Sequence, residues 1–429
     1  MLIQGGLVID PASGRQGQWD IRVQDGKIAA IGPNLSALST ETIVPATGCI
    51  VAPGLVDIHV HFRDPGLTHK EDLSTGSCAA AAGGFTTVVC MANTKPVMDS
   101  PKMVEEFYTR AAREAVINLY TVGSVTYNLA GKELTDFAAL KEAGAVGFSD
   151  DGNPVESAAL MRQALEQAGS VGLPVISHAG DLSLVADTIV NEGPIAKRLG
   201  LKGMPTAAED IHVARDVLLA KLTGQHVHIQ HVSSATAIAI IREAKARGIK
   251  VTAEAGPHHF TLTDEALLEH GTNAKMNPPL RTFSDVAAVR QGLADGTLDA
   301  IATDHAPHTA EEKAVGMKKA PCGIVGLETA LALVWTELVR PNILTPMQAL
   351  AKLTYVPAQI LGLNKGTLAP GGNADITIFD PTAQWEVRPE QFFSKSHNTP
   401  FAGRKLTGQV VATIVGGRMV FNQGKIVAR

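Results

Sequence analysis

The sequence has little cysteine, and its cysteines lie far apart without forming a CxxC pair. Disulfide bonds are therefore not expected, and a reducing compartment is the natural setting. The first residues lack the basic stretch followed by an apolar one that marks a signal peptide, and no apolar run is long enough to span a bilayer. We therefore expect a cytoplasmic protein with no membrane partner. The four cysteines are Cys49, Cys78, Cys90 and Cys322.

Aromatic residues and basic blocks are also scarce. Aromatics make up 4% of the chain, and 37 Lys and Arg residues stand against 42 Asp and Glu residues, which gives a net charge of −5. A nucleic-acid partner has no electrostatic support in this composition. Hydrophobic residues make up 45% and charged residues 18%, which favours a large buried core over disorder. A length of 429 residues suits a barrel with a smaller module attached.

Both ends of the chain are rich in short strand patterns. At the amino end, the second pattern contains an Asp25-Gly26 turn signal, and at the carboxyl end Gly416-Gly417 marks a hairpin. We expect residues 1–52 and 366–429 to build one small β-sandwich together. The predicted strands are Leu2–Ile9, Ile21–Ile31, Ala374–Phe379, Val410–Val415 and Arg418–Val427.

The middle of the chain, residues 53–365, alternates apolar strand patterns with amphipathic helices such as Lys102–Val116, Ala158–Ser170, Ala208–Leu222 and Ala235–Arg247. Eight such units predict an α/β fold of the (β/α)₈ TIM-like type, with the site at the carboxyl ends of the strands. A doubly wound open sheet is the alternative, but the GxGxxG turn that it would need after the first strand is absent. The predicted strands are Leu55–Val60, Thr86–Met91, Asn118–Val122, Ala145–Ser149, Pro174–Ser177, His226–Gln230, Lys250–Ala255 and Asp299–Thr303.

The segment from Asp57 to His61 at the end of the first predicted strand suggests metal binding. Residues two apart on a strand share a face, so Asp57, His59 and His61 point one way. Neutral imidazole is a good ligand for zinc, and two on one short segment can hold a single cation. An HxH pair alone is weak support because it occurs often by chance.

Other metal-competent residues follow the ends of later predicted strands. His178 follows the fifth and His231 the sixth, whereas Asp304 follows the eighth and Asp150-Asp151 the fourth. Any one of these residues alone is more simply explained as a turn residue or a helix cap. Turns and caps do not explain why so many residues that can bind metal follow the ends of different strands. A metal site is therefore predicted.

The alternation within residues 226–231 also sorts the remaining histidines of that strand. It puts His231 on the face of Val227 and Ile229, opposite His226 and His228. His226 and His228 are then expected to face the helices or to be structural. His69, His212, His270 and His397 belong to no such constellation, and we expect them at the surface or at helix caps.

These motifs resemble the amidohydrolase superfamily along essentially the whole chain, and within it they are most similar to bacterial dihydroorotases. That resemblance implies two zinc ions per subunit, bridged by Asp151 and by a water or hydroxide. Asp151 stands where many relatives carry a carboxylated lysine, and Asp150 is the alternative bridge. By the resemblance, His59, His61 and Asp304 hold the first zinc, and His178 and His231 the second. The matching stretches are residues 57–66, 91–94, 148–152, 277–281 and 303–308.

The resemblance further implies reversible cyclisation of N-carbamoyl-L-aspartate to L-dihydroorotate, with Asp304 as the catalytic proton carrier. Arg63 would bind the substrate carboxylate through its planar fork, although a surface salt bridge with Asp64 or Glu71 is the plainer alternative. The expected substrate contacts are His61, Arg63, Asn93, Asn277, His308, Cys322 and Gly323.

Several alternatives stay open at this point. A hydantoinase or allantoinase would use the same fold, but it generally carries the bridging lysine and needs no arginine after the HxH pair. A non-catalytic structural partner of aspartate transcarbamoylase would lose ligands, whereas all six positions are filled here. A homodimer, or an active enzyme associated with aspartate transcarbamoylase, is compatible with the sequence. Residues 308–321 suit a mobile lid and an ordinary surface loop equally.

Overall fold

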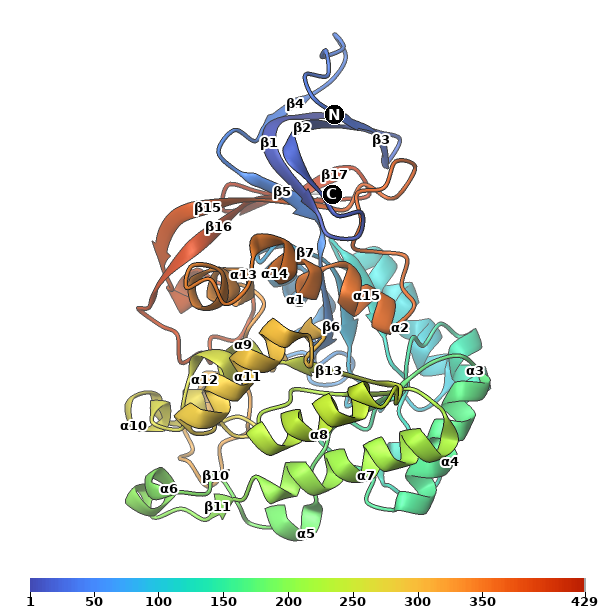
Figure 1. Ribbon diagram of the computed structural model, residues 1–429, viewed down its shortest axis with the longest axis vertical. Coiled ribbons are helices and arrows are strands. Elements are labelled where there is room, and N and C mark those ends of the chain that lie inside the picture. Colours follow the sequence, from blue (N-terminus) through green and yellow to red (C-terminus); the bar gives the residue numbers. More distant parts are fainter. Residues whose placement is uncertain (428–429) are drawn as a thin grey trace.

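The computed structural model describes residues 1–427, so positions 428 and 429 of the predicted carboxyl-terminal module lie outside the described residues. Both termini lie together in a β-rich module, and the rest of the chain forms an α/β body below it (Figure 1). The two pieces of the module are far apart in sequence. They meet where β5 (Ile50–Pro53) pairs antiparallel with β15 (Ile376–Glu386). The strand β5 runs across the boundary predicted between residues 52 and 53.

Parallel strands close into a ring in the body of the molecule. Their pairing runs from β6 through β7 to β8, and from β9 through β12 and β13 to β14. Parallel bridges join the two groups of strands at both ends. Phe148 pairs with Gly123 and with Val175, and Val60 of β6 pairs with His305, which follows β14. The predicted barrel is confirmed. The named barrel strands are β6 (Leu55–Val60), β7 (Phe85–Cys90), β8 (Asn118–Thr121), β9 (Val175–Ser177), β12 (Val227–Ile229), β13 (Val251–Ala255) and β14 (Ala300–Ile301).

The fourth barrel position differs from the prediction of a regular strand at Ala145–Ser149. Only Phe148 forms bridges there, although Ile176 N still donates to Phe148 O at 2.8 Å and Ser149 N to Gly123 O at 2.9 Å. Glycines at 144 and 147 weaken regular strand pairing because they offer no side chain to pack. The chain therefore keeps its place in the ring without forming a regular strand.

Helices surround the ring, and α4, α7, α8 and α11 pack against one another in that order. Several helices of the body begin at side-chain caps, as at α1 and α14, where Asp72 with Thr75 and Thr345 with Gln348 form capping boxes. The longer helices are α1 (Leu73–Ala82), α2 (Pro101–Glu114), α3 (Phe137–Glu142), α4 (Ala158–Ser170), α6 (Pro194–Leu199), α7 (Ala207–Thr223), α8 (Ala235–Ala246), α11 (Phe283–Asp295), α14 (Pro346–Leu353) and α15 (Tyr355–Ile360). Shorter ones are α5 (Leu182–Val185), α9 (Pro257–Thr261), α10 (Ala266–His270), α12 (Ala310–Lys313) and α13 (Ala330–Val334).

The terminal module is one nine-stranded sheet in the order β18-β17-β16-β15-β5-β1-β2-β3, with β4 beside β1. The two halves of the predicted sandwich are thus hydrogen-bonded into a continuous sheet, and its buried residues, such as Ile21, Ile376 and Ile414, form one apolar cluster. Its other strands are β1 (Leu2–Asp10), β2 (Arg15–Gln24), β3 (Lys27–Gly32), β4 (Ile43–Pro45), β16 (Lys405–Val415), β17 (Arg418–Asn422) and β18 (Lys425–Ile426).

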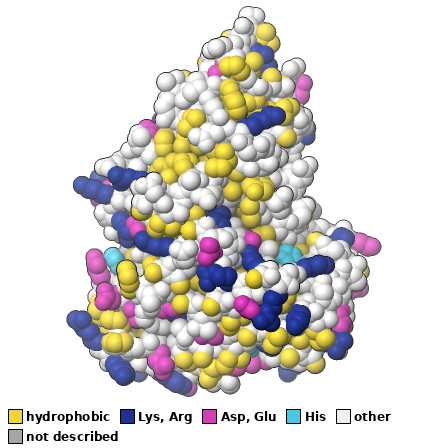
Figure 2. All heavy atoms as spheres, in the orientation of Figure 1, with side chains coloured by type: hydrophobic (Ala, Val, Ile, Leu, Met, Phe, Trp, Pro, Cys, Tyr) yellow, Lys and Arg dark blue, Asp and Glu magenta, His cyan; other side chains and the backbone are white. Residues whose placement is uncertain are grey.

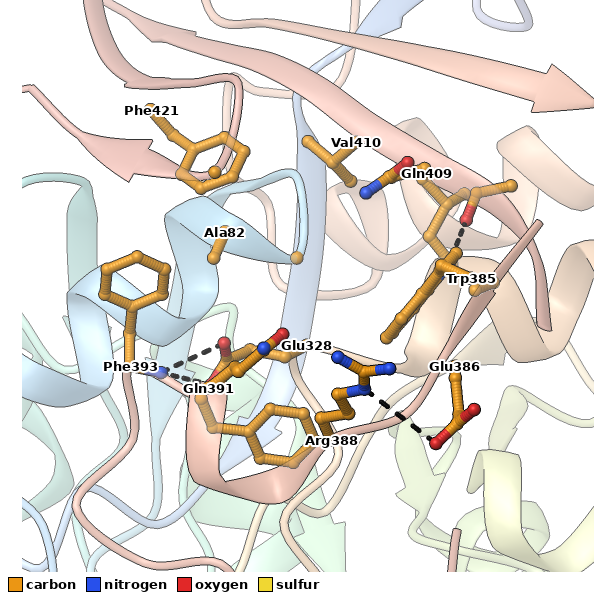
Figure 3. Close-up of a pocket in the computed structure, with 16 residues that line it drawn as sticks. Ala82, Glu328, Trp385, Glu386, Arg388, Gln391, Phe393, Gln409, Val410 and Phe421 are labelled. Carbon is orange, nitrogen blue, oxygen red and sulfur yellow. Dashed lines mark hydrogen bonds and ion pairs between the residues drawn. The ribbon is translucent and has the colours of Figure 1, made fainter. Parts of the chain in front are cut away.

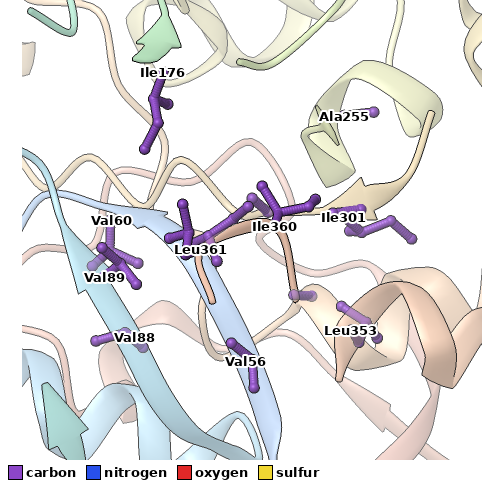
Figure 4. Close-up of a cluster of buried hydrophobic side chains, with 14 of the residues drawn as sticks. Val56, Val60, Val88, Val89, Ile176, Ala255, Ile301, Leu353, Ile360 and Leu361 are labelled. Carbon is purple, nitrogen blue, oxygen red and sulfur yellow. The ribbon is translucent and has the colours of Figure 1, made fainter. Parts of the chain in front are cut away.

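The main core lies between the barrel strands and the helices that surround them. Val56 and Val60 of β6 and Ile301 of β14 belong to the same buried cluster as Ile360 and Leu361 at the end of α15 (Figure 4). Lys, Arg, Asp and Glu side chains are interspersed over the face shown in Figure 2. Among residues 1–427, every helix is too short or too polar to cross a membrane.

Candidate metal centre

The carboxyl ends of the barrel strands bring the predicted metal ligands together. Asp151 Oδ1 lies 3.5 Å from His59 Nε2, 3.3 Å from His178 Nδ1 and 3.6 Å from His231 Nε2. Asp304 Oδ1 lies 3.0 Å from His61 Nε2 and 3.4 Å from His59 Nε2. All six side chains are buried. Side chains from the ends of five barrel strands therefore form one cluster inside the mouth of the barrel.

The donor set fits divalent metal. Ligand atoms within 4.8 Å of one another form three groups, namely His59 with His61 and Asp151, His59 with His231 and Asp304, and Asp151 with His178 and His231. Asp151 Oδ1 is buried without a hydrogen-bond partner, although histidine nitrogens surround it. Buried carboxylate oxygens are normally paired or bound to a metal. This unpartnered oxygen is the observation that best fits a cation between the side chains.

The electrostatics of the centre favour positive charge. Burial alone would lower the pKa of His59, but Asp304, Asp151 and Glu254 raise it well above its usual value. Burial would raise the pKa of Asp304, but the neighbouring His59 and His61 hold it below its usual range, so the carboxylate is ionised. A cation bound among these groups would supply the charge that the carboxylates attract.

Neighbouring side chains orient the ligands. Asn93 Oδ1 accepts a hydrogen bond from His61 Nδ1 at 2.9 Å, which leaves His61 Nε2 facing the carboxylates. Asp150 points away, since it accepts from Val125 N at 2.7 Å and from the Thr126 hydroxyl. Asp151, not Asp150, therefore faces the histidines.

Three residues at the centre have left-handed backbone conformations, with φ of 58° at Arg63, 33° at His231 and 47° at Asp304. Such conformations are costly for residues other than glycine, and they gather at functional sites where the surrounding structure enforces them. At these three positions, the chain leaves its strand and turns the side chain toward the barrel mouth.

A cavity of about 250 Å³ opens above the metal centre. Arg63, Asn93, Asn277, His308 and Cys322 line it together with the candidate ligands His61, Asp151, His178, His231 and Asp304. His59 is fully buried beneath them, and Gly323 packs behind His308, where a Cβ would lie 2.5 Å from Ala306 O. The cavity thus brings the histidine–aspartate cluster together with the positively charged side chain of Arg63.

Arg63 is held at the wall of this cavity. Its Nε donates to Pro307 O at 3.2 Å and its Nη2 lies 3.1 Å from His308 Nε2, whereas Asp64 is paired with Arg110. The surface salt bridge considered for Arg63 is therefore absent from the described structure. Burial lowers the pKa of Arg63 to about 10, which leaves it charged at neutral pH. Its guanidinium is available to a carboxylate entering the cavity.

Comparison with known proteins identifies the family. A "Dihydro-orotase-like" family model matches residues 48–237, and an "Amidohydrolase family" model matches residues 212–421. The chain is 54% identical to a dihydroorotase from Pelotomaculum thermopropionicum, over 98% of each chain. It is 51% identical to a dihydroorotase from Pelobacter propionicus, over 99% of this chain and 100% of that one. The chain belongs to the dihydroorotase family.

Solved structures of related enzymes share the fold of this dihydroorotase-family chain. An L-hydantoinase (dihydropyrimidinase) from Arthrobacter aurescens superposes with a TM-score of 0.91 at 27% identity, covering 100% of this chain and 97% of that one. A dihydropyrimidinase from Brevibacillus agri superposes with a TM-score of 0.84 at 25% identity, covering 99% of this chain and 96% of that one. The barrel and the terminal module are thus shared with enzymes named hydantoinase and dihydropyrimidinase.

The loop after β14 is anchored in this member of the dihydroorotase family. Lys313 Nζ donates to Pro321 O and Gly323 O, both at 3.0 Å, on either side of Cys322. Asn398, from the carboxyl-terminal segment, donates to Ala306 O and Gly323 O at 3.0 Å. Residues 308–323 are therefore tied to the site wall by buried bonds, which fits a fixed loop better than a freely mobile lid.

The structure corrects two predictions about histidines. His228 and Gln230 face the barrel interior, where His228 Nε2 lies 3.0 Å from Glu254 Oε2 and Gln230 Nε2 lies 3.2 Å from His59 Nδ1. Strict alternation is therefore wrong for residues 226–231, because the left-handed turn at His231 breaks it. Of the two roles predicted for His228, facing the helices is wrong, whereas a structural role agrees with its hydrogen bonds. His212 is buried in α7, where its Nδ1 accepts from Gly180 N at 3.3 Å, and does not lie at the surface.

Sequence reasoning also missed Glu254, Lys313 and Asn398. Glu254 could have been noticed, because it is a charged residue inside the apolar strand β13 and buried charges require a partner. Lys313 and Asn398 offered no local signal. Their contacts join segments that are distant in the chain and meet only after folding.

A larger groove of about 380 Å³ lies between the barrel and the terminal module (Figure 3). Aromatic side chains line it, including Trp385, Phe393 and Phe421. Glu328 lies at its wall and accepts from Phe393 N at 2.9 Å, and burial raises the pKa of Glu328 to about 8. Its lining contains no histidine, so it offers no comparable ligand cluster.

Proposed function

We propose that the chain catalyses the reversible, metal-dependent cyclisation of N-carbamoyl-L-aspartate to L-dihydroorotate in pyrimidine biosynthesis. The observation that carries this proposal is the presence of Arg63 in the same cavity as the histidine–aspartate cluster. An enzyme that acts on a cyclic amide with an exocyclic carboxylate needs two features in one cavity. One is a centre that activates water, and the other is a positively charged side chain that binds the carboxylate. Relatives that are 54% and 51% identical and named dihydroorotase support the same substrate.

We further propose that the centre holds two zinc ions. His59, His61 and Asp304 would hold one, His178 and His231 the other, and Asp151 would contribute one carboxylate oxygen to each. When bound, such metals lower the pKa of a coordinated water and polarise the carbonyl under attack. The two ligand groups that contain Asp151, one with His59 and His61 and the other with His178 and His231, support this division.

Asp304 is proposed as the proton carrier. Its ionised carboxylate lines the cavity and is oriented by His61 at 3.0 Å. In ring opening, it takes a proton from the attacking water and passes it to the ring nitrogen as the amide bond breaks. In ring closure, the same carboxyl group protonates the hydroxyl that leaves as water.

Arg63, Asn93, His308 and Asn277 are proposed to bind the substrate. The Arg63 guanidinium faces the carboxylate, with His308 held beside it by the contact between His308 and Arg63. Burial lowers the pKa of His308 to about 3, so this ring is neutral and leaves Arg63 as the cation of the pair. Cys322 would present backbone groups to the substrate ring, held in place by the bonds from Lys313 to Pro321 O and Gly323 O. Gly323, whose own N donates to Lys275 O and whose O accepts from Lys313 and Asn398, would contribute by shaping the wall behind His308.

A substrate panel tests the proposed function. The purified, zinc-loaded protein is assayed for ring opening of dihydroorotate, hydantoin and allantoin in parallel. We expect fast, chelator-sensitive turnover of dihydroorotate alone. Turnover of only the uncharged rings would refute the proposal and favour the activity for which the structurally similar hydantoinases are named.

Arg63→Ala should lower kcat/KM for dihydroorotate about 10- to 100-fold, because hydrogen bonds to charged groups contribute about 1.5–3 kcal/mol. An uncharged cyclic amide should lose far less, since it has no carboxylate to bind. Arg110→Ala is a matched control, because that arginine pairs with Asp64 outside the cavity. Equal losses on charged and uncharged rings would assign Arg63 a structural role.

We also propose a cytoplasmic homodimer, and association with aspartate transcarbamoylase is a further candidate. The cysteines are all free thiols, as in proteins of a reducing compartment. Ile211, Leu218 and Leu222 form an exposed apolar stripe on α7, and Leu218 is 62% exposed. Figure 2 shows apolar side chains near the lower edge, where Figure 1 places α5 and α7. Exposed apolar stripes of this kind often mark protein interfaces.

Leu218→Glu is expected to convert the dimer to a monomer, because it buries a charge at the proposed interface. Light scattering measures the mass of the protein, with and without aspartate transcarbamoylase. Ile43→Glu is the control, since Ile43 is 41% exposed but lies in the terminal module. A Leu218→Glu protein that stays dimeric would exclude α7 from the interface.

A further inference from the structure

A row of buried polar side chains runs from the metal centre along two neighbouring barrel strands. His59 Nδ1 lies 2.7 Å from Glu254 Oε1, and Glu254 Oε2 lies 3.0 Å from His228 Nε2. The Thr252 hydroxyl then lies 2.9 Å from His228 Nδ1 and 2.8 Å from His226 Nε2. The row links a candidate metal ligand to the partly exposed His226, which immediately precedes β12.

The strand register explains why these residues meet. In the parallel pair β12 and β13, His228 lies opposite Thr252. Residues two apart share a face, so His226 and His228 align with Thr252 and Glu254 inside the barrel. His59 reaches Glu254 across the barrel from β6, which is not a neighbour of β13. The row therefore crosses the barrel interior and does not lie under the helices.

The polarity of these hydrogen bonds is fixed by the carboxylate. Ionised Glu254 can only accept, so both His59 Nδ1 and His228 Nε2 must donate to it. With its Nε2 donating to Glu254, His228 can accept at Nδ1 from the Thr252 hydroxyl, whose oxygen accepts from His226 Nε2. Gln230 Nε2 lies 3.2 Å from His59 Nδ1, but the carboxylate at 2.7 Å is the nearer partner for that nitrogen.

We infer that the row Glu254–His228–Thr252–His226 is a positioning device that holds His59 in the tautomer with its proton on Nδ1. That tautomer leaves the lone pair of Nε2 facing Asp151 and Asp304 at 3.5 and 3.4 Å, where the metal would bind. The inference rests on the proposed metal centre. None of the three outer members of the row, His228, Thr252 and His226, lines the cavity over that centre. Outer residues of this kind commonly change metal affinity 10- to 100-fold.

Zinc affinity, measured by competition with a chromophoric chelator, tests the inference. We expect Glu254→Gln and His228→Phe to weaken zinc binding about 10- to 100-fold, and Thr252→Val, one step further away, about three- to tenfold. His228→Gln and Thr252→Ser should restore most of the affinity, because each returns a group that can donate in the same place. These two conservative variants keep the inference testable if His228→Phe or Thr252→Val fails to fold.

Thr87→Val is the matched control, since Thr87 is a buried threonine of another barrel strand whose hydroxyl accepts from Asn118 Nδ2 at 3.4 Å. It should match Thr252→Val in unfolding temperature while keeping the wild-type zinc affinity. Ring-nitrogen NMR of the zinc-loaded protein, in which the metal occupies Nε2 of His59, gives a second readout. The proton on Nδ1 of His59 should be protected from exchange with solvent in wild type and should exchange faster in Glu254→Ala, which leaves no acceptor at that position.

Two outcomes would overturn the inference. One is that Thr252→Val and His228→Phe bind zinc within twofold of wild type, and the other is that their losses equal that of Thr87→Val. If the wild-type protein itself fails to bind zinc, the proposed metal centre is wrong and the inference falls with it. The wild-type measurement therefore separates failure of the metal centre from failure of the positioning role alone.

Discussion

Asp304→Asn should lower kcat for dihydroorotate about 10²- to 10⁴-fold, the range expected when a general acid–base group is removed. The amide keeps the size and one oxygen of the carboxylate but cannot accept and return a proton. Asn also tolerates the left-handed backbone at this position, where φ is 47°, better than most residues do. The substitution therefore removes the chemistry with little disturbance of the turn that follows β14.

Zinc content must be measured with kcat, because Asp304 is also a candidate ligand and its loss could weaken metal binding. A variant that is inactive with full zinc content would isolate the proton transfer. Asp10→Asn is a matched control, since Asp10 is a buried aspartate of the terminal module that bonds Ser13 at 2.7 Å. A zinc-loaded Asp304→Asn protein with more than a tenth of wild-type kcat would assign the proton transfer to another group.

The barrel and the position of its site were predictable because both follow from periodic patterns. Helix α4 was predicted with the bounds that the structure gives, Ala158–Ser170, and so was β6, Leu55–Val60. Candidate ligands placed after strand ends must converge in a closed parallel barrel, whatever the details of the loops. His178 and Asp304, which are far apart in sequence, therefore line the same cavity.

Prediction was wrong where the backbone leaves the regular strand. Alternation assumes an extended chain up to the last residue, but His231 has a φ of 33° and turns to the mouth on its own. His228 and Gln230, which precede it, point inward to Glu254 and His59. A single left-handed residue thus reverses the face assigned to a whole strand, and the sequence carries no sign of it because His231 is not a glycine.

Contacts between segments that are distant in the sequence are a second reason why the site could not be predicted in full. Asn398 joins Ala306 and Gly323 at 3.0 Å, although it belongs to the segment that also builds the terminal module. No local pattern in the sequence links these positions. The contact shows that the carboxyl-terminal segment helps to shape the site wall and is not only a separate β-module.

His59→Ala and His178→Ala should differ in how much metal they lose. His59 belongs to two of the three ligand groups, whereas His178 belongs to only one. We therefore expect His59→Ala to lose nearly all zinc, and His178→Ala to keep about one equivalent per chain. Both should lose activity by at least about a hundredfold, because the substrate carbonyl and the attacking water would no longer be activated together.

Metal content by elemental analysis, together with chelator-sensitive turnover, measures both effects. His259→Ala is the control, because His259 is a buried histidine that lies outside all three groups and whose Nε2 donates to Pro278 O at 3.1 Å. It should keep its full zinc content. Equal zinc loss in the His59 and His178 variants would mean that the ions bind only as a pair held by Asp151. Two full equivalents in His178→Ala would instead remove His178 from the ligand set, and His231 with Asp151 would have to hold the second ion without it.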